Sequence, residues 1–154
     1  MVYKVARTLT ISDAAYLAGL IDGEGTISLS RRHANERRQL VVSISSTEPD
    51  LVDWPVKATG VGKVTRKRTS SDNHAPGLTY SVSNRQALAV LEQVEPYLRS
   101  YKKARARLAL DHYVALTPRN GKYTPQLSRQ REAFKKTFLS MTAAANNRAA
   151  RAAR

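Results

Sequence analysis

Apolar residues recur along the chain with two different spacings, which predict strands and helices in a regular order. Residues 26–33 (TISLSRRH) and 39–45 (QLVVSIS) carry apolar side chains at alternate positions, a pattern typical of strands with one buried face. Residues 61–70 (VGKVTRKRTS) and 77–83 (GLTYSVS) predict a second pair of strands, joined by the loop SDNHAPG. Elsewhere, apolar residues recur at spacings of three and four, which indicates helices.

The first two helices are bounded by residues that commonly start or stop a helix. Ser12 and Asp13 supply N-cap chemistry for a helix that runs to about residue 22. A second helix is expected over residues 49–60, because this segment opens on a proline and stops at a glycine. Pro55 lies inside it and costs about 3 kcal/mol there, so the helix is expected to end early or to bend.

Helices also follow the second strand pair. Asn84 is expected to cap a helix that Pro96 breaks. Residues 97–116 predict a long basic helix. Thr124, which is followed by a proline, predicts a last helix that ends near residue 141.

This order of elements indicates an α+β fold. A helix, two strands, a helix, two strands and further helices suit a four-stranded antiparallel sheet with the helices on one face. A chain of 154 residues is long enough for one domain and short for two. We assign residues 1–141 to this domain and expect residues 142–154, a basic segment rich in alanine and arginine, to form a disordered tail.

The charge of the chain points to its partner. The formal net charge is +14, whereas an ordinary soluble surface mixes both signs. So large a positive excess on a small domain indicates a polyanion, and nucleic acid is the simplest one. The chain has no cysteine and three histidines, which excludes disulfides and thiolate metal sites. Any metal is therefore expected to be a hard cation held by oxygen ligands.

The sequence shows no sign of membrane insertion or secretion. No apolar run approaches the roughly 20 residues that span a bilayer. The N-terminus, MVYKVARTLT, lacks the apolar core of a signal peptide. We therefore expect an intracellular, soluble protein without a membrane partner, in a bacterial cytoplasm or in the matrix or stroma of an organelle.

Residues 16–25 (YLAGLIDGEG) combine small residues on one side of a helix with a carboxylate at its end. Small residues at spacings of three and four let a second helix approach closely, and the steric reason is not limited to membranes. Two such helices would bring two Glu24 carboxylates together beside backbone carbonyls, and hard divalent cations prefer such oxygen clusters. The residues expected at this helix interface are Ala15, Ala18, Gly19, Asp22 and Gly23.

Residues 17–25 (LAGLIDGEG) closely resemble the signature of the LAGLIDADG homing endonucleases, with seven of nine letters identical. The family's order of elements, αββαββα, is the one derived above, and residues 60–64 (GVGKV) and 96–110 (PYLRSYKKARARLAL) also resemble family features. The signature occurs once, which resembles the single-motif branch that works as a homodimer. The resemblance implies an intron-encoded hydrolase that makes double-strand breaks in a long, near-palindromic DNA site. Its implied cofactor is Mg²⁺, with Mn²⁺ or Ca²⁺ able to replace it in binding.

The resemblance also assigns roles at the end of the signature helix. Glu24, the last acid of the signature, is expected to bind the catalytic divalent metal, and Gly23 to offer its backbone carbonyl. Asp22 is expected to cap or tune the helix end rather than to bind metal. A glutamate in place of the commoner aspartate keeps an oxygen ligand on a side chain one methylene longer, so metal binding is expected to persist.

Two further catalytic roles follow from position in the family pattern. A family lysine near the start of the long helix lies by the scissile phosphates. Lys102 is the best match, and Lys103 is the alternative because the alignment needs a one-residue shift. In the family a polar residue, often glutamine, follows the second strand and organises the attacking water. This sequence has SSTEP there, so Ser46 is the candidate for that role and Glu48 the alternative.

Strand residues opposite the apolar ones form the expected DNA-binding surface. Successive side chains of a strand point to opposite faces, and the family lays the polar face of its sheet in the major groove of DNA. Arginine, lysine and glutamine discriminate between bases, whereas serine and threonine read them more loosely. The expected DNA-binding residues are Ser28, Ser30, Arg32, Gln39, Ser43, Lys63, Thr65, Lys67, Thr79 and Ser81.

Two other classes of function remain open. A non-catalytic nucleic-acid binder of the same fold, such as an RNA splicing maturase or a regulator, is favoured by the missing glutamine. The retained Glu24 and Lys102 oppose it. A structural protein that packages nucleic acid is allowed by the basic tail but opposed by the signature.

Overall fold

The computed structural model describes residues 3–67 and 76–154; most of the predicted loop at 71–77 lies outside them. Within these residues, no helix is long and apolar enough to cross a bilayer. In chain order the elements are α1 (Ile11–Glu24), β1 (Gly25–Ser30), β2 (Gln39–Ser46), α2 (Pro49–Thr59), β3 (Lys63–Arg66), β4 (Leu78–Ser83), α3 (Asn84–Val94), the 3₁₀ helix η1 (Glu95–Tyr97), α4 (Lys102–His112), α5 (Pro125–Ser140) and α6 (Ala143–Ala152).

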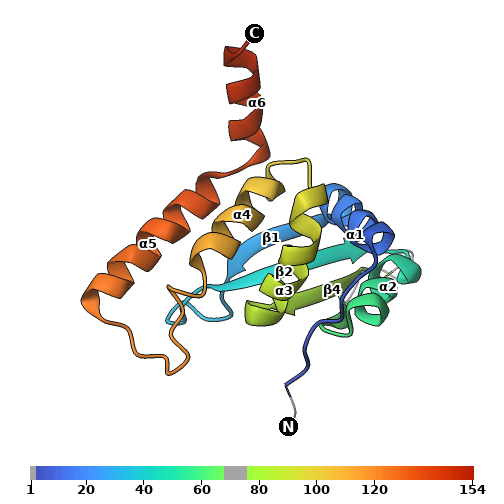
Figure 1. The fold of residues 1–154 in the computed structure, drawn as a ribbon, viewed down its shortest axis with the longest axis horizontal. Coiled ribbons are helices and arrows are strands. Elements are labelled where there is room, and N and C mark those ends of the chain that lie inside the picture. Colours follow the sequence, from blue (N-terminus) through green and yellow to red (C-terminus); the bar gives the residue numbers. More distant parts are fainter. Residues whose placement is uncertain (1–2, 68–75) are drawn as a thin grey trace.

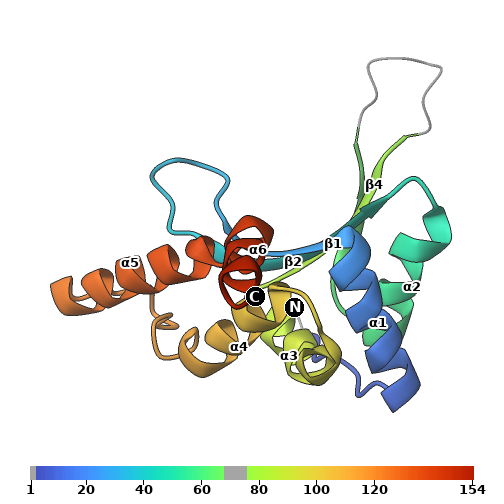
Figure 2. The ribbon, with the colours of Figure 1, turned by 90° about the horizontal axis from the view of Figure 1, so that it is seen from above.

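The strands form one antiparallel sheet in the order β1-β2-β4-β3. Helices α1, α2, α3 and α4 lie on one face of this sheet and leave its opposite face uncovered (Figure 2). Helix α5 lies beyond the β1 edge (Figure 1). The α+β class, the αββαββα order of the first seven elements and the one-sided covering by helices are therefore confirmed.

The core lies between the sheet and the helices. The apolar strand positions face it as the period of two predicts, and Leu17 and Ile21 of α1 and Leu91 of α3 pack onto them without exposed surface. Val64 is half-buried against the same core. The buried strand residues are Ile27, Leu29, Leu40, Val42, Ile44, Tyr80 and Val82.

Helix α1 begins two residues earlier than the sequence predicted and ends two residues later. Thr10, rather than Ser12 or Asp13, is its N-cap, because the Thr10 hydroxyl accepts a hydrogen bond from the Asp13 backbone N–H at 3.1 Å. The helix then continues to Glu24, so the whole signature except its last glycine is helical.

Helix α2 passes through its internal proline. The chain stays helical through Pro55 to Thr59, so the expected early end is wrong. The Thr59 hydroxyl donates to the Pro55 carbonyl at 2.6 Å and stabilises this last turn. Gly60 ends the helix as predicted, in the left-handed conformation with φ +72°, which glycine adopts without steric cost.

Asn84 is not the N-cap of α3. It is the first helical residue, with a positive φ of 55°, and Ser83 stands at the cap position without a side-chain hydrogen bond. The Asn84 amide instead donates to Gln39 and accepts from the Tyr113 hydroxyl. Its side chain therefore links α3 to β2 and to the end of α4.

The basic segment 97–116 is not one helix. Only Lys102–His112 forms α4, because Leu98 is extended and the backbone N–H groups of Arg99 and Ser100 bond to the side chain of Asp22. By contrast, Thr124 caps α5 as predicted, accepting from the Leu127 N–H at 3.1 Å.

The segment expected to be a disordered tail forms helix α6 in the structure. Thr142 caps it by accepting from the Ala145 N–H at 3.2 Å, and none of its residues is buried. Figure 1 shows α6 projecting away from the sheet and its helices. The division of the chain at residue 141 remains a prediction.

Candidate active site and nucleic-acid interface

Helix α1 delivers an exposed carboxylate to one end of the sheet. The chain passes from Glu24 directly into β1 at Gly25, and Glu24 and Gly23 are both exposed. A Cβ on Gly25 would lie 2.7 Å from the Ile21 Cα and 3.0 Å from the Ser43 carbonyl oxygen. Glycine is required there because helix and sheet backbones approach too closely for any side chain. This turn fixes where Glu24 projects.

Asp22 is occupied by the segment that leads into α4. Its carboxylate accepts from the Arg99 N–H at 2.9 Å, from the Ser100 N–H at 3.2 Å and from the Ser100 hydroxyl at 2.5 Å. It caps this neighbouring segment rather than the end of its own helix. These contacts hold the start of α4 against the end of α1.

Lys102 and Lys103 point to different places. The Lys102 ammonium donates to the carbonyls of Ile21 and Asp22, each at 2.8 Å, and the residue is 8% exposed. Burial lowers the pKa of Lys102, while the nearby carboxylates of Asp22 and Glu24 oppose the shift. The Lys103 ammonium instead bonds to the Glu95 carbonyl at 2.9 Å. Of the two candidates, only Lys102 therefore lies at the carboxylate end of α1.

Ser46 lies at the end of β2, near the same place. The ladder pairs Gly25 with Ile44, which brings the end of β2 beside the end of α1. Ser46 is half-buried, and its hydroxyl accepts from the Glu48 N–H at 3.1 Å. Its role in holding water remains a prediction, as does that of Glu48.

One chain supplies few metal ligands at this end of the sheet. Across residues 3–67 and 76–154, no three histidine, aspartate or glutamate side chains gather closely enough to hold an ion. With Asp22 engaged by backbone donors, the exposed carboxylates of this end are Glu24 and, after β2, Glu48. Glu24 alone would leave most of the coordination of a hard divalent cation to other oxygen donors.

The exposed side of α1 differs in part from the interface predicted for it. Ala15, Gly19 and Gly23 are exposed at spacings of four, and a Cβ at either glycine would meet open space. Ile11 extends the same row and is 75% exposed. Ala18 was also predicted at this interface, but it packs into the core and has no exposed surface, so it is not part of the exposed row.

The strand register brings most of the predicted DNA-binding residues onto the uncovered face. Ser43 pairs with Ser81, which pairs with Lys63, and Thr79 pairs with Thr65 in the neighbouring row. Arg32 lies just beyond β1 and is exposed. The predicted residues that share this face by strand alternation are Ser28, Ser30, Gln39, Ser43, Lys63, Thr65, Lys67, Thr79 and Ser81.

Two more polar side chains belong to this face. Thr26 continues the alternation of β1, and Ser45 continues that of β2. The Ser45 and Thr79 hydroxyls lie 2.9 Å apart across the ladder. The alternating sequence pattern contained the signal for both residues, although neither was predicted.

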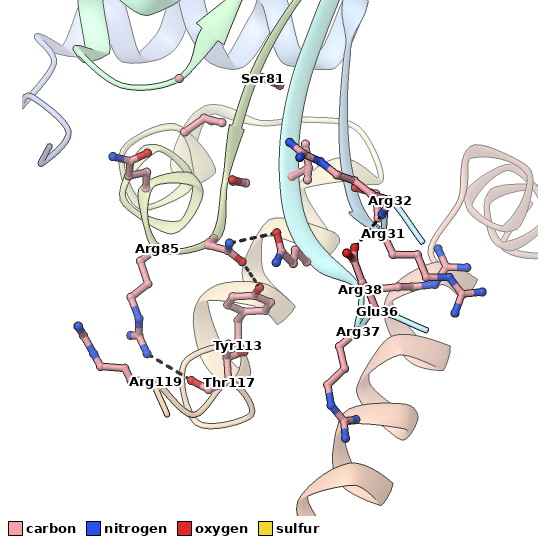
Figure 3. A pocket seen from close by; sticks show the side chains of 18 of the residues that line it. Arg31, Arg32, Glu36, Arg37, Arg38, Ser81, Arg85, Tyr113, Thr117 and Arg119 are labelled. Carbon is pink, nitrogen blue, oxygen red and sulfur yellow. Dashed lines mark hydrogen bonds between the residues drawn. The ribbon is translucent and has the colours of Figure 1, made fainter. Parts of the chain in front are cut away.

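An open groove of about 1510 Å³ continues the polar face at the end of the sheet away from Glu24. Its lining includes seven arginines and two lysines but a single glutamate, Glu36. Figure 3 shows Arg85 and Arg119 on one side of the groove and Arg31, Arg32 and Arg37 on the other. Arg85 and Arg119 were not predicted from the sequence, because neither belongs to a strand.

Comparison with solved structures finds homing endonucleases that have a similar fold. The homing endonuclease I-CvuI in complex with its target is 22% identical, with a TM-score of 0.69 over 86% of this chain and 83% of that one. The archaeal intron-encoded homing endonuclease I-Vdi141I, in complex with DNA, is 16% identical, with a TM-score of 0.66 over 85% and 84%. The LAGLIDADG meganuclease I-AabMI, bound to uncleaved DNA, is 22% identical, with a TM-score of 0.60 over 79% and 43%.

These likenesses show that the chain has the LAGLIDADG homing endonuclease fold, as the signature implied. No protein-family model matches the chain, and no curated protein matches it by sequence. The chain spans most of I-CvuI and I-Vdi141I but less than half of I-AabMI. Its length therefore corresponds to the smaller of these proteins.

Proposed function

We propose that the protein is a site-specific, metal-dependent DNA endonuclease of the single-motif LAGLIDADG branch, acting as a homodimer. It would cut both strands of a long, near-palindromic site, with its uncovered sheet face on the DNA. The observation that carries the proposal is the exposed Glu24 at the end of the signature helix, beside Gly23 and Lys102. Its structural neighbours include homing endonucleases in complex with DNA.

The donor groups at this end suit a hard divalent cation. Glu24 offers carboxylate oxygens and Gly23 a backbone carbonyl, and two copies of the chain would double this set. A bound Mg²⁺ would supply an activated water and stabilise the departing 3′ oxygen. Mn²⁺ and Ca²⁺ share the same preference for oxygen ligands and are proposed to replace Mg²⁺ in binding.

Lys102 and Ser46, near Glu24, would add a positive charge and a hydroxyl group that holds water. The hydrogen bonds from Lys102 to Ile21 and Asp22 hold its ammonium at the end of α1, where a scissile phosphate would lie. A cation placed there stabilises charge that develops in the transition state. Ser46 is proposed to hold the attacking water, since its hydroxyl lies at the adjacent end of β2.

The open row on α1 supports assembly of two copies. Gly19 and Gly23 leave room for another helix backbone, and Ala15 adds a small side chain. Close approach along this row would bring the two Glu24 side chains together at the dimer axis. The proposed homodimer thereby places a second Glu24 carboxylate beside the first.

A cleavage assay tests the proposed function. A duplex of the protein's own locus without its intron is incubated with the protein and Mg²⁺, and then with EDTA added. Double-strand breaks that require Mg²⁺ are expected. Specific binding without cleavage under any divalent metal would instead favour a maturase or regulator, a function that the missing glutamine after β2 already favours.

A further inference from the structure

We propose that the arginine-lined groove, which shares Ser30, Arg32, Gln39, Lys63 and Ser81 with the predicted sheet surface, extends it and binds the phosphate backbone of double-stranded DNA next to the segment read by the sheet. The inference rests on the proposed function and extends its DNA contacts beyond the strands. The groove lies at the Ser30–Gln39 end of the β1–β2 ladder, whereas Glu24 precedes the Gly25–Ile44 end. The five residue steps from Gly25 to Ser30 separate these ends by roughly 17 Å.

The two sides of the groove come from segments far apart in the chain. Arg85 belongs to the first turn of α3 and donates to the Thr117 carbonyl at 3.3 Å, which joins it to the segment that carries Arg119. The opposite side is the β1–β2 loop, with Arg31 and Arg32 (Figure 3). A groove with cations on both sides and one carboxylate in its lining favours a continuous polyanion.

A buried arginine ties the two sides together. Arg131 of α5 is 8% exposed and donates to the Arg38 carbonyl at 2.6 Å on one side. On the other side it donates to the Leu116 carbonyl at 2.8 Å and to the Thr117 hydroxyl at 2.7 Å. The ion pairs among the described residues do not include Arg131, so its charge adds to the field of the groove.

The floor of the groove is also fixed by hydrogen bonds. The Tyr113 hydroxyl accepts from the Leu40 N–H at 3.1 Å and donates to the Asn84 side chain at 2.7 Å. Asn84, held at φ 55°, donates in turn to Gln39 at 3.3 Å. A residue held in this sparsely populated conformation suggests a functional constraint at the start of α3.

The β1–β2 loop is held in place as well. The Arg37 guanidinium lies 3.7 Å from the centre of the Tyr123 ring and donates to the Ser128 hydroxyl at 3.3 Å. Arg38 donates to the Leu29 carbonyl at 3.0 Å. The groove is therefore largely pre-formed, which lowers the ordering cost of binding.

Binding to DNA of mixed sequence measures the proposed phosphate contacts of the groove separately from base recognition by the sheet. A double variant, Arg85→Ala with Arg119→Ala, is compared with the wild type on a long duplex of mixed sequence over a range of salt concentrations. Log affinity falls as log salt rises, and for every phosphate that the variant no longer neutralises this slope is expected to become less steep by about 0.9. The matched control is Lys57→Ala with Arg107→Ala, which removes two charges from the helices that cover the other face. Its slope is expected to stay near that of the wild type.

Trimming the DNA locates the contacts. Removing about one helical turn, roughly 10 base pairs, from each end of a duplex that just spans the dimer should weaken the wild type more than the double variant. Arg119→Ala alone, at an exposed position, serves if the double variant does not fold. Equal slopes and equal sensitivity to trimming in the wild type and the double variant would overturn the inference. Tighter binding of the wild type to an RNA duplex than to a DNA duplex of the same sequence would also overturn it.

The two proposals fail differently in these experiments. A wild type that binds neither its own locus nor mixed-sequence DNA would refute the proposed function and, with it, this inference. A wild type that binds and cuts its site, while the double variant keeps the wild-type slope, would leave the proposed function standing and refute the groove.

Discussion

At one end of the sheet, α1 runs into β1 at Glu24, and Lys102 bonds to the carbonyls of Ile21 and Asp22; at the other end, arginines surround an open groove. The first end exposes the carboxylates of Glu24 and, just after β2, of Glu48, and residues 3–67 and 76–154 gather no cluster of three metal-binding side chains. The second takes its cations from the N-terminal segment, the β1–β2 loop, β3, α3, the segment before α5 and α5 itself, and Arg131 of α5 bonds to two of the others. The Glu24 end is therefore proposed to need a second copy, whereas all the cations of the groove come from one chain.

This difference separates affinity from chemistry. Charge spread over a groove contributes to binding through counterion release. This contribution depends strongly on salt concentration and only weakly on the placement of any one side chain. Metal-assisted cleavage requires a few oxygens and a cation in a fixed geometry. Variants at the Glu24 end should thus change rate, and variants at the groove end should change affinity.

Glu24→Gln should have the largest effect. The substitution keeps the size of the side chain and removes its negative charge, so cleavage should become undetectable while DNA affinity remains near wild type. Single-turnover cleavage and a binding titration measure the two quantities. Glu92→Gln, an exposed carboxylate on α3, is the control and should change neither. Cleavage by Glu24→Gln at the wild-type rate would place the metal elsewhere.

Gly19→Leu should prevent assembly without harming the fold of the monomer. The space beyond Gly19 is open in the chain, and leucine favours helix by about 0.8 kcal/mol over glycine. The variant is expected to sediment near 17.1 kDa, and the wild type near twice that mass. Glu92→Leu adds the same side chain away from this row and should leave the dimer intact. A monomeric variant that still cuts both strands would contradict the two-chain site.

Lys102→Met should lower the single-turnover rate by about 100-fold, with little loss of affinity, because the removed charge acts mainly on the transition state. Lys103→Met is the matched control. Its ammonium bonds near Glu95, on a different side of α4. Normal cleavage by the Lys102 variant, or an equal loss in both variants, would remove the lysine from the active site.

Arg32→Ala and Lys67→Ala should have the smallest effects. Each is expected to weaken binding, and a base-reading residue should also relax preference at one position in each half-site, by roughly 1–3 kcal/mol. A binding selection on randomised half-sites measures both changes. Unchanged affinity and preference in the two variants, which alter opposite ends of the sheet, would show that its uncovered face does not lie in the groove of DNA.

The sequence predicted the sheet well because alternation is a local property. The period of two predicts that Ile27, Val42 and Tyr80 are buried. The residues between such positions point to the opposite face and make it polar. The signature predicted where a carboxylate would project, and the structure places Lys102 rather than Lys103 beside it.

Features that depend on distant partners were missed. Arg131 bonds to a carbonyl 93 residues away, and Arg105 to the Ile27 carbonyl 78 residues away, and both charged residues are buried, which the sequence did not predict. Asp22 likewise interrupts the predicted helix at 97–116 from 77 residues away. Local periodicity carries no information on such contacts.

Co-expression of wild-type and Glu24→Gln chains tests the central claim most directly, because it produces mixed dimers with one carboxylate at the axis. Tags on the two chains allow the mixed dimer to be purified, and its action on a supercoiled plasmid that carries the target site is followed. A site shared by both chains predicts neither nicked nor linear product from the mixed dimer. Efficient nicking of one strand by the mixed dimer would show that each chain carries its own complete site and would contradict the account.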